Sequence, residues 1–412
     1  MPAATPLKDL DLFRDAIVSS TLPAADTASG VSLNSWQSAL TLAATEATKT
    51  KPLVIVIDEF PYLVQRQQGQ EVETGTQHAW DRRLEKLPVL LILIGSDVSL
   101  MESLAVHGRP LFGRPTREMV IDPMTPREFA SLLKLAPVDA IDAYLVVGGF
   151  PGVVKRWPSG ADLWSFLRDA LNDSESSLIV NGERILSAEF PSDAHARSIL
   201  RAIGHGETTY TNIMRTAGVP QTTVDRALRM LSAQKRIVSA PTPLSARPSD
   251  EKRYFIADPY LRFWQRFIEP AIPEIDRGRG DLVLQDIRAN WGTYRGRAVE
   301  PLVRDSLARM LPDARFGDAK YVGAYWTRKN VPEVDVVGVP SEKPNRVSFV
   351  GSIKWRDDSP FYDRDLRALS AVAPQVPGVD ANTLLVGIAR TRLEVKGLNV
   401  GLVAADLLNA WR

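Results

Sequence analysis

Residues 53–64 have the sequence LVIVIDEFPYLV, and this stretch decides the fold of the N-terminal part of the chain. The unbroken aliphatic run 53–57 is typical of a parallel strand that is covered on both faces. It ends in Asp58 and Glu59, at the strand end where open α/β sheets bind their ligands. Asp58 would hold Mg²⁺ there, and Glu59 would polarise an attacking water in phosphoryl transfer. The alternative is a core strand that leaves into a polar loop.

A second apolar run, residues 89–94 (VLLILI), is followed by Gly95, Ser96 and Asp97. We expect the two strands to be parallel, so that their polar ends lie at one edge of a sheet. Ser96 would sense the γ-phosphate at that edge. The alternative is that Ser96 or Asp97 caps the helix that follows, and one side chain can serve both roles.

Arg114 lies in a Gly-Arg-Pro turn, before a short strand expected at residues 119–121. Its charge would neutralise a transferring phosphate, as an arginine finger does. A surface salt bridge is the alternative role for this side chain.

Four segments carry a family resemblance when they are taken in combination: 53–64, 90–104 (LLILIGSDVSLMESL), 110–129 (PLFGRPTREMVIDPMTPREF) and 144–154 (YLVVGGFPGVV). They resemble the prokaryotic archaeal-type ATPases, a STAND/AAA-like P-loop group with a C-terminal DUF234, restriction-nuclease-like domain. The resemblance runs from about residue 30 to about residue 395. It implies ATP and Mg²⁺ as cofactors, with Asp58 and Glu59 as the Walker B pair, Ser96 at the sensor position and Arg114 as the conserved arginine of the turn.

The phosphate-binding loop of that family is missing from the sequence. A loop of the form GxxxxGK[ST] cradles the phosphates, and the chain contains no Gly-Lys pair. One explanation is a truncated or misassigned start that lacks roughly fifty to seventy residues. The other is a true pseudo-ATPase. We favour truncation, because loss of the family's interior strand would expose the edge of a very apolar neighbour.

The middle of the chain has two different patterns. Residues 125–193 are amphipathic and predict a small helical lid, and residues 194–272 predict a winged helix-turn-helix with its recognition helix at 221–234. Thr222, Thr223, Arg226 and Arg229 would face DNA. The alternative is a packing or oligomerisation module, because the net charge of +1 gives no global attraction to nucleic acid.

Residues 273–412 have the pattern of a restriction-type nuclease. Glu300 lies on an expected helix, Asp335 on a strand, and Lys354 at the end of the next strand. Such carboxylates bind Mg²⁺ while the lysine activates water. Ser352 stands where the family usually has an acid, which leaves Glu333 as a substitute ligand. We therefore expect a retained fold that serves binding, and we do not expect cleavage.

Composition supports an ordinary globular protein of 412 residues. The absence of cysteine excludes disulfides and thiolate zinc sites. A cytoplasmic protein without a membrane segment is expected, because the longest apolar run is too short to cross a bilayer.

The prediction is an α/β chain with four parts. These are a partial P-loop NTPase core (1–124), a helical lid (125–193), a winged helix (194–272) and a nuclease-like domain (273–412). Its function would be that of an ATP-hydrolysing, DNA-associated ATPase in which nucleotide state controls the C-terminal modules, with a homo-oligomer as a further expected state. The alternative is a non-catalytic DNA- or protein-binding adaptor.

Overall fold

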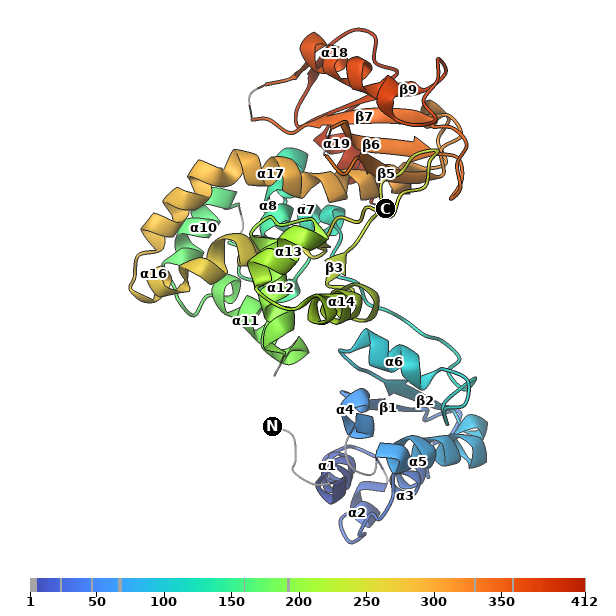
Figure 1. Cartoon of the computed structure of the whole chain (residues 1–412). Helices are drawn as coiled ribbons and strands as arrows, with labels where there is room; N and C mark the ends of the chain where they lie inside the picture. Colours follow the sequence, from blue (N-terminus) through green and yellow to red (C-terminus); the bar gives the residue numbers. More distant parts are fainter. Residues whose placement is uncertain are drawn as a thin grey trace. The chain divides into compact units, whose positions relative to one another are not determined.

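The computed structural model describes residues 6–22, 24–45, 47–65, 69–158, 160–190, 193–329, 331–357 and 359–411. The chain forms a mixed α/β structure and divides into two compact units, Met1–Ile121 and Asp122–Arg412 (Figure 1).

The first unit contains a parallel pair of strands among short helices. The strands are β1 (Leu53–Ile57) and β2 (Val89–Leu93), paired in register from Leu53 opposite Val89 to Ile57 opposite Leu93. The helices are α1 (Pro6–Val18), α2 (Ala24–Ala28), α3 (Trp36–Ala43), α4 (Phe60–Gln65), α5 (Gly69–Arg82), a 3-10 turn (Leu84–Lys86) and α6 (Val98–Leu104).

One face of β1 builds the core of this unit. Leu53, Ile55 and Ile57 are buried together with side chains of α3 and α5, among them Leu40 and Val72. The predicted parallel pairing of the two strands is therefore confirmed.

The opposite face of the strand pair is exposed, which corrects the prediction of a strand covered on both faces. Val54, Val56, Leu90, Ile92 and Ile94 are between 37% and 58% exposed. An aliphatic run indicates that both faces of the strand are apolar, but it does not predict which elements cover each face.

The short strand predicted at residues 119–121 is also wrong. These residues form no strand, and Met119, Val120 and Ile121 are 68%, 57% and 86% exposed. Their β-branched and apolar character favours a strand only where a neighbouring strand is available to pair with it.

The second unit begins with a bundle of helices around its largest core. Trp264 is fully buried in this core, where its indole N–H donates to the Ile179 carbonyl. Gly182 makes that packing feasible, because a Cβ at this position would lie 2.2 Å from the Trp264 ring. The helices are α7 (Pro126–Leu133), α8 (Pro137–Val147), α9 (Pro151–Val154), α10 (Leu163–Leu171), α11 (Ser177–Glu189), α12 (Ala194–Gly204), α13 (Tyr210–Ala217), α14 (Gln221–Arg229), α15 (Pro259–Phe263) and α16 (Ile272–Asp276).

Helices α12, α13 and α14 are followed by a short antiparallel strand pair. The chain continues from α14 through a π-helical turn (Met230–Gln234) into β3 (Val238–Ser239), which pairs with β4 (Phe255–Ile256). The predicted recognition helix 221–234 corresponds to α14 and this turn.

The C-terminal part of the second unit is a mixed sheet between helices. The described residues form five strands in the order β11-β9-β7-β6-β5, with β11, β9 and β7 parallel and β7, β6 and β5 antiparallel. Their bounds are β5 (Tyr321–Trp326), β6 (Glu333–Val339), β7 (Phe349–Lys354), β9 (Leu384–Ala389) and β11 (Val400–Leu402), and a separate pair is formed by β8 (Phe361–Tyr362) and β10 (Leu393–Glu394).

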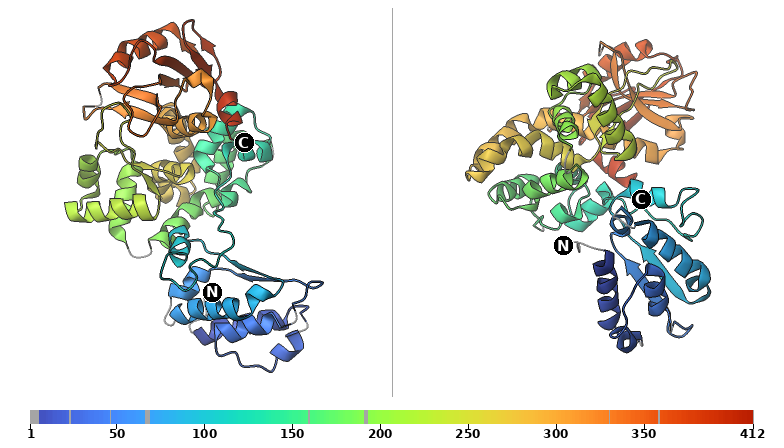
Figure 2. Two further views of the ribbon diagram at one scale, coloured as in Figure 1. Left: turned by 90° about the vertical axis from the view of Figure 1, so that its right-hand side faces the viewer. Right: turned by 60° about the horizontal axis from the view of Figure 1, so that its bottom comes forward.

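Helix α17 (Gly280–Met310) joins the helical bundle to this sheet (Figure 2). Its N-terminal half, with Val283 and Ile287, packs in the bundle core, and its C-terminal half, with Val299 and Val303, packs under the sheet. Helix α18 (Asp363–Val372) covers the other face of the sheet through Leu369, and α19 (Ala404–Asn409) lies on the α17 side.

Among the described helices, none combines the length and apolar character that crossing a bilayer would require.

Candidate functional site

The carboxylates at the end of β1 lie in a tight, strained turn. Asp58 accepts a hydrogen bond from the Glu59 backbone N–H at 3.0 Å, and Glu59 has a φ of +53°. A left-handed conformation is uncommon outside glycine, and such strain often marks a functional position. Phe60, which is fully buried, anchors the residue that follows. The turn therefore presents both exposed carboxylates at the edge of the strand pair.

The end of β2 brings a hydroxyl group to Glu59. Ser96 Oγ donates to Glu59 Oε2 at 3.2 Å, across the two neighbouring strands. Gly95 allows this approach, because a Cβ there would lie 2.4 Å from the Pro61 ring. Asp97 caps α6 by accepting from the Leu100 N–H at 3.0 Å. The structure therefore brings Ser96 and Glu59 together, while Asp97 takes the capping role.

Arg114 is held by other partners. Its Nε and Nη2 atoms bind both carboxylate oxygens of Asp81 on α5, at 2.8 and 2.7 Å. Nη1 donates to the carbonyls of Pro110 and Phe112 in its own turn. The Arg114 guanidinium, through its hydrogen bonds, lowers the pKa of the Asp81 carboxyl, and Asp81 in turn raises the pKa of Arg114. These contacts give Arg114 the geometry of a bidentate ion pair.

The donor set at this edge suits Mg²⁺. Mg²⁺ prefers oxygen ligands and is usually bound through one or two carboxylates with several waters retained. Asp58 and Glu59 are exposed and supply such oxygens. A phosphate chain finds no comparable fit, because the 412 residues hold no Gly-Lys pair.

A second group of polar residues lies between α17 and the sheet. Arg304 on α17 donates to Glu300 Oε2 at 3.2 Å and to the backbone carbonyl of Asp335 at 2.9 Å. Ser352 Oγ and the Ile353 N–H donate to Asp335 Oδ2 at 3.1 and 2.8 Å. Burial raises the pKa of the Glu300 carboxyl. The side chains of Glu300 and Asp335 are thus engaged by protein donors.

The remaining residues of the predicted nuclease constellation do not complete a metal cluster. Glu333 is paired with Arg253, with Nη2 at 3.2 Å from Oε2 and a second, shorter contact of 2.6 Å to Oε1. Lys354 is the last residue of β7. Burial acts to raise the pKa of Asp365, but hydrogen bonds, chiefly from Arg356, lower it, and the charge of Lys354 adds a small lowering. Within the part of the chain that the structure describes, no three acidic or histidine side chains are grouped to hold a metal ion.

The exposed face of α14 carries the polar residues predicted to meet DNA. Thr222, Arg226 and Arg229 are exposed, and Thr223 is half-buried. Pro220 stands at the N-cap, so the helix begins at the point where recognition residues are expected.

The segment between β3 and β4, residues 240–254, lies against the C-terminal sheet. The Leu244 N–H donates to the Ala324 carbonyl of β5, and the Ala246 N–H donates to the Pro377 carbonyl. The Trp326 indole donates to the Glu251 carbonyl, and Arg253 lies over the Trp326 ring. The β3–β4 segment is therefore held against the C-terminal sheet by these contacts.

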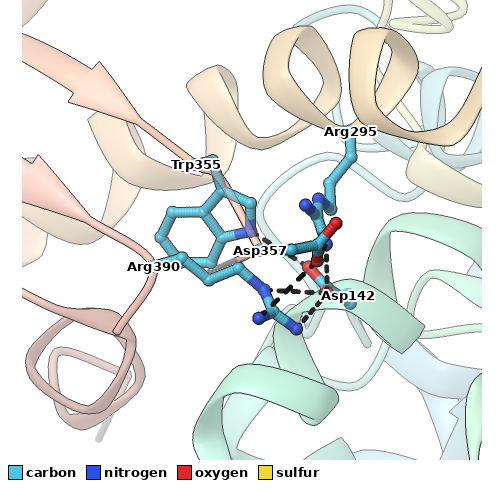
Figure 3. A network of polar contacts seen from close by, with 5 residues as sticks. All are labelled: Asp142, Arg295, Trp355, Asp357 and Arg390. Atoms are coloured by element: carbon cyan, nitrogen blue, oxygen red, sulfur yellow. Dashed lines mark hydrogen bonds and ion pairs between the residues drawn. The ribbon is translucent and has the colours of Figure 1, made fainter. Parts of the chain in front are cut away.

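One polar network was not predicted from the sequence. Asp142 of α8 accepts from Arg295 of α17, from the Trp355 indole and from Arg390, and Asp357 also binds Arg295 (Figure 3). These residues come from four distant parts of the chain, so no local motif signals the network. The available sign in the sequence was an acid, Asp142, placed between the apolar residues Ile141 and Ala143 of α8.

The match to a protein family concerns the C-terminal part of the chain. Residues 264–367 match the DUF234 family, described as "Archaea bacterial proteins of unknown function". This match falls in the C-terminal part of the chain, where the resemblance to the archaeal-type ATPases predicts a DUF234 domain. The family resemblance of the sequence is thereby confirmed.

The DUF234 match contains α17 and strands β5 to β7, which carry Glu300, Asp335 and Lys354. An uncharacterised protein of Methanocaldococcus jannaschii is 26% identical over 325 residues, which cover 77% of this chain and 70% of the relative.

Two solved structures show a weaker likeness to this chain. A Walker-type ATPase of Pyrococcus abyssi is 19% identical with a TM-score of 0.43, and the match covers 63% of this chain and 76% of that one. The Orc1 protein of Aeropyrum pernix, solved in complex with DNA, is 15% identical with a TM-score of 0.29, over 68% and 76% of the two chains. At these TM-scores neither structure bears on the arrangement of residues described above.

Proposed function

We propose that the first unit carries the magnesium- and water-binding edge of an ATPase. The observation that carries this proposal is the Ser96–Glu59 hydrogen bond of 3.2 Å at the carboxyl ends of two parallel strands. Asp58 would hold Mg²⁺, whose charge stabilises phosphate oxygens when it is bound. Glu59 accepts a proton from, or orients, the attacking water, and Ser96 fixes one oxygen of the Glu59 carboxylate.

Hydrolysis at this edge also needs a phosphate-binding loop. The backbone amides of such a loop and its lysine supply most of the contacts to the phosphates. Because the 412 residues contain no Gly-Lys pair, we place this loop outside them. Tight ATP binding then depends on its addition.

We assign Arg114 to a structural role in this function. Its guanidinium makes four hydrogen bonds, two to Asp81 and two to backbone carbonyls. Reaching a phosphate would require Arg114 to leave all of these acceptors. The ion pair holds the 110–114 turn against α5 instead.

Phosphate release tests the assignment of Glu59. The assay uses the chain extended by the coding sequence that precedes Met1, with Mg²⁺ and ATP, with and without duplex DNA. Glu59→Gln should lower kcat by about 10²-fold or more, because general-base catalysis contributes that much, and should leave ATP binding in place. Glu85→Gln, an exposed acid of the same unit, is the matched control. Turnover of Glu59→Gln at the rate of Glu85→Gln would refute the role.

A second candidate function is DNA binding through α14, which the exposed Arg226 and Arg229 favour. The β3–β4 segment makes its contacts with the sheet, so a wing contact to DNA is not part of this proposal. The exposed side chains of α14 indicate attraction to DNA phosphates, and they do not indicate which bases would be preferred.

Fluorescence anisotropy with a labelled duplex tests this second function. Replacing Arg226 and Arg229 by Gln should weaken binding and lower the slope of log K against log salt by about two, because each phosphate contact contributes about one. Arg168→Gln and Arg277→Gln, two exposed arginines on other helices or at their ends, form the control pair. An equal loss in both pairs would assign the effect to net charge.

For the C-terminal part we propose a nuclease-like fold that binds and does not cleave. Ser352 occupies the position of a metal-binding acid and donates a hydrogen bond to Asp335. Glu333 is neutralised by Arg253. The carboxylates whose negative charge Mg²⁺ would need are therefore already engaged by protein partners.

A further inference from the structure

The second unit contains a cavity of about 460 Å³. Four residues of the network drawn in Figure 3 line it: Asp142, Arg295, Asp357 and Arg390. Its walls come from the α7–α8 connection, the turn before α10, helix α17 and the loops after β7 and β9. This volume falls in the range of small-molecule sites. None of the residues proposed above for nucleotide hydrolysis or DNA binding lines it.

Arg295, which lines this cavity, has one side-chain donor without an acceptor among the described residues. Its side chain is 2% exposed, yet its Nε atom is buried without a hydrogen-bond acceptor among the described residues. An unpaired buried donor of a charged group is costly, so an acceptor at this position would stabilise the site.

Asp142 is not available to satisfy that donor. Its Oδ1 accepts from the Trp355 indole at 3.0 Å. Its Oδ2 accepts from Arg295 Nη1 at 3.0 Å and from Arg390 at 2.9 and 3.1 Å. With both oxygens occupied, Asp142 fixes the two guanidinium groups in place.

Asp357 is the replaceable partner of these arginines. It binds Arg295 Nη1 at 2.6 Å and lies 3.8 Å from Arg390 Nη1, but its side chain is 61% exposed. An exposed carboxylate gains little from such a pair. It occupies the place of an oxyanion at the mouth of the cavity.

We propose that this cavity binds a small phosphomonoester of mononucleotide size, whose phosphate replaces Asp357 on Arg295 and Arg390. Guanidinium groups bind phosphate oxygens bidentately, and Lys134 at the cavity wall adds a third cation. The indoles of Trp164 and Trp291 pack edge to face, and they offer an apolar wall for the ring of the ligand.

The acidic side chains of the cavity limit how much negative charge a bound ligand can carry. Asp139 and Asp162 also line it, and the Asp162 carboxylate accepts from the first N–H groups of α10. Together with Asp142 they balance the three cations once Asp357 has moved away. A single phosphate group is therefore accepted more readily than a polyphosphate or a nucleic-acid strand.

Calorimetric titration of the full chain with AMP, inorganic phosphate and adenosine tests the proposal. AMP and phosphate should bind and adenosine should not, because the oxyanion supplies the main contacts. Asp357→Ala should bind AMP about two- to fivefold more tightly, since it removes a competing carboxylate of an exposed ion pair. Asp276→Ala, an exposed acid at the end of α16 and away from the cavity, is the matched control and should bind as the unaltered chain does.

Two further variants keep the result decisive. Arg390→Gln should weaken AMP binding about tenfold or more, because it removes a charged hydrogen-bond donor. Lys134→Gln, an exposed position where loss of the fold is not expected, should weaken it less, and Asp58→Asn should not change it. The proposal is overturned if neither AMP nor phosphate binds at millimolar concentration. It also fails if adenosine binds as well as AMP, if Asp357→Ala matches Asp276→Ala, or if Asp58→Asn abolishes binding.

Discussion

Asp142 shows how one buried carboxylate holds distant parts of the second unit together. Its side chain is 7% exposed, and it is the shared partner of Arg295 and Arg390. Desolvation of such charges is tolerated only when each has a partner in good geometry. Among the described residues, removing the carboxylate would leave the two guanidinium groups with the exposed Asp357 as their acidic partner.

Asp142→Ala should therefore lower the free energy of unfolding of the second unit by about 3–5 kcal/mol, the usual cost of breaking a buried ion pair from one side. Urea denaturation followed by tryptophan fluorescence measures this change. Asp139→Asn, an exposed acid on the same helix, should change stability by less than about 1 kcal/mol. Similar losses in both variants would show that the network adds nothing specific.

Residues at the ends of β1 and β2 could be grouped from sequence, whereas the Asp142 network could not. Parallel strands bring their carboxyl ends to one edge, so the contact between Glu59 and Ser96 follows from two local patterns. Asp142 and Arg390 are 248 positions apart, and only the tertiary fold brings them together. The salt bridge of Arg114 was one of two stated alternatives, and its partner Asp81 had no sequence signal.

At the scale of elements, α15 begins at a half-buried acid. Asp258 caps the helix by accepting from the Leu261 N–H at 2.7 Å. Burial raises the pKa of the Asp258 carboxyl above its ordinary value of 3.8, although the backbone hydrogen bond and Arg262 act in the opposite direction. The folded state therefore binds this proton more tightly than the unfolded state does.

This shift predicts a pH dependence of stability. The folded state binds more protons between the ordinary pKa and the raised pKa, so the contribution of Asp258 to the free energy of unfolding falls as pH rises through that window. Asp258→Asn keeps a capping oxygen and has no charge to desolvate. Its stability relative to the unaltered chain should rise from pH 4 toward neutral pH in denaturation experiments. A difference that stays constant with pH would contradict the role of burial.

The elements themselves were predicted better than their surroundings. The strands expected at Asp335 and before Lys354 are β6 and β7, and α14 begins at Gln221 as expected. The helix expected around Glu300 is α17, which begins as early as Gly280 because its first turns pack on the bundle core. Residues 119–121 show the opposite error, since a strand needs a partner that local composition does not supply.

The β3–β4 segment shows how tertiary packing decides the role of a predicted wing. A charged turn between two strands favours contact with a nucleic acid. Here its backbone donates to carbonyls of β5 and of residue 377, and Arg253 pairs with Glu333. Local sequence patterns do not predict such contacts between segments that are far apart in the chain.

At the scale of the whole molecule, two properties of the first unit concern the same strand pair. The sequence provides the acidic edge without a phosphate loop, and the face of β1 and β2 with Val54, Val56 and Leu90 is exposed. Contiguous apolar surface of this kind usually marks an interaction site in soluble proteins. The homo-oligomer expected from the sequence stays a prediction, and this face is where we would look for it.

Magnesium-dependent ATP binding is the most direct test of the central claim that Asp58 and Glu59 form a nucleotide-hydrolysing edge. Calorimetric titration of ATP, with Mg²⁺ and with EDTA, should be made on the 412-residue chain and on the chain extended by the coding sequence before Met1. We predict saturable binding that requires Mg²⁺ in a chain that carries a GxxxxGK[ST] loop, and weakening of about tenfold or more in Asp58→Asn, because a metal-binding carboxylate is lost. Absence of magnesium-dependent binding in both chains, or equal binding by Asp58→Asn, would contradict the account.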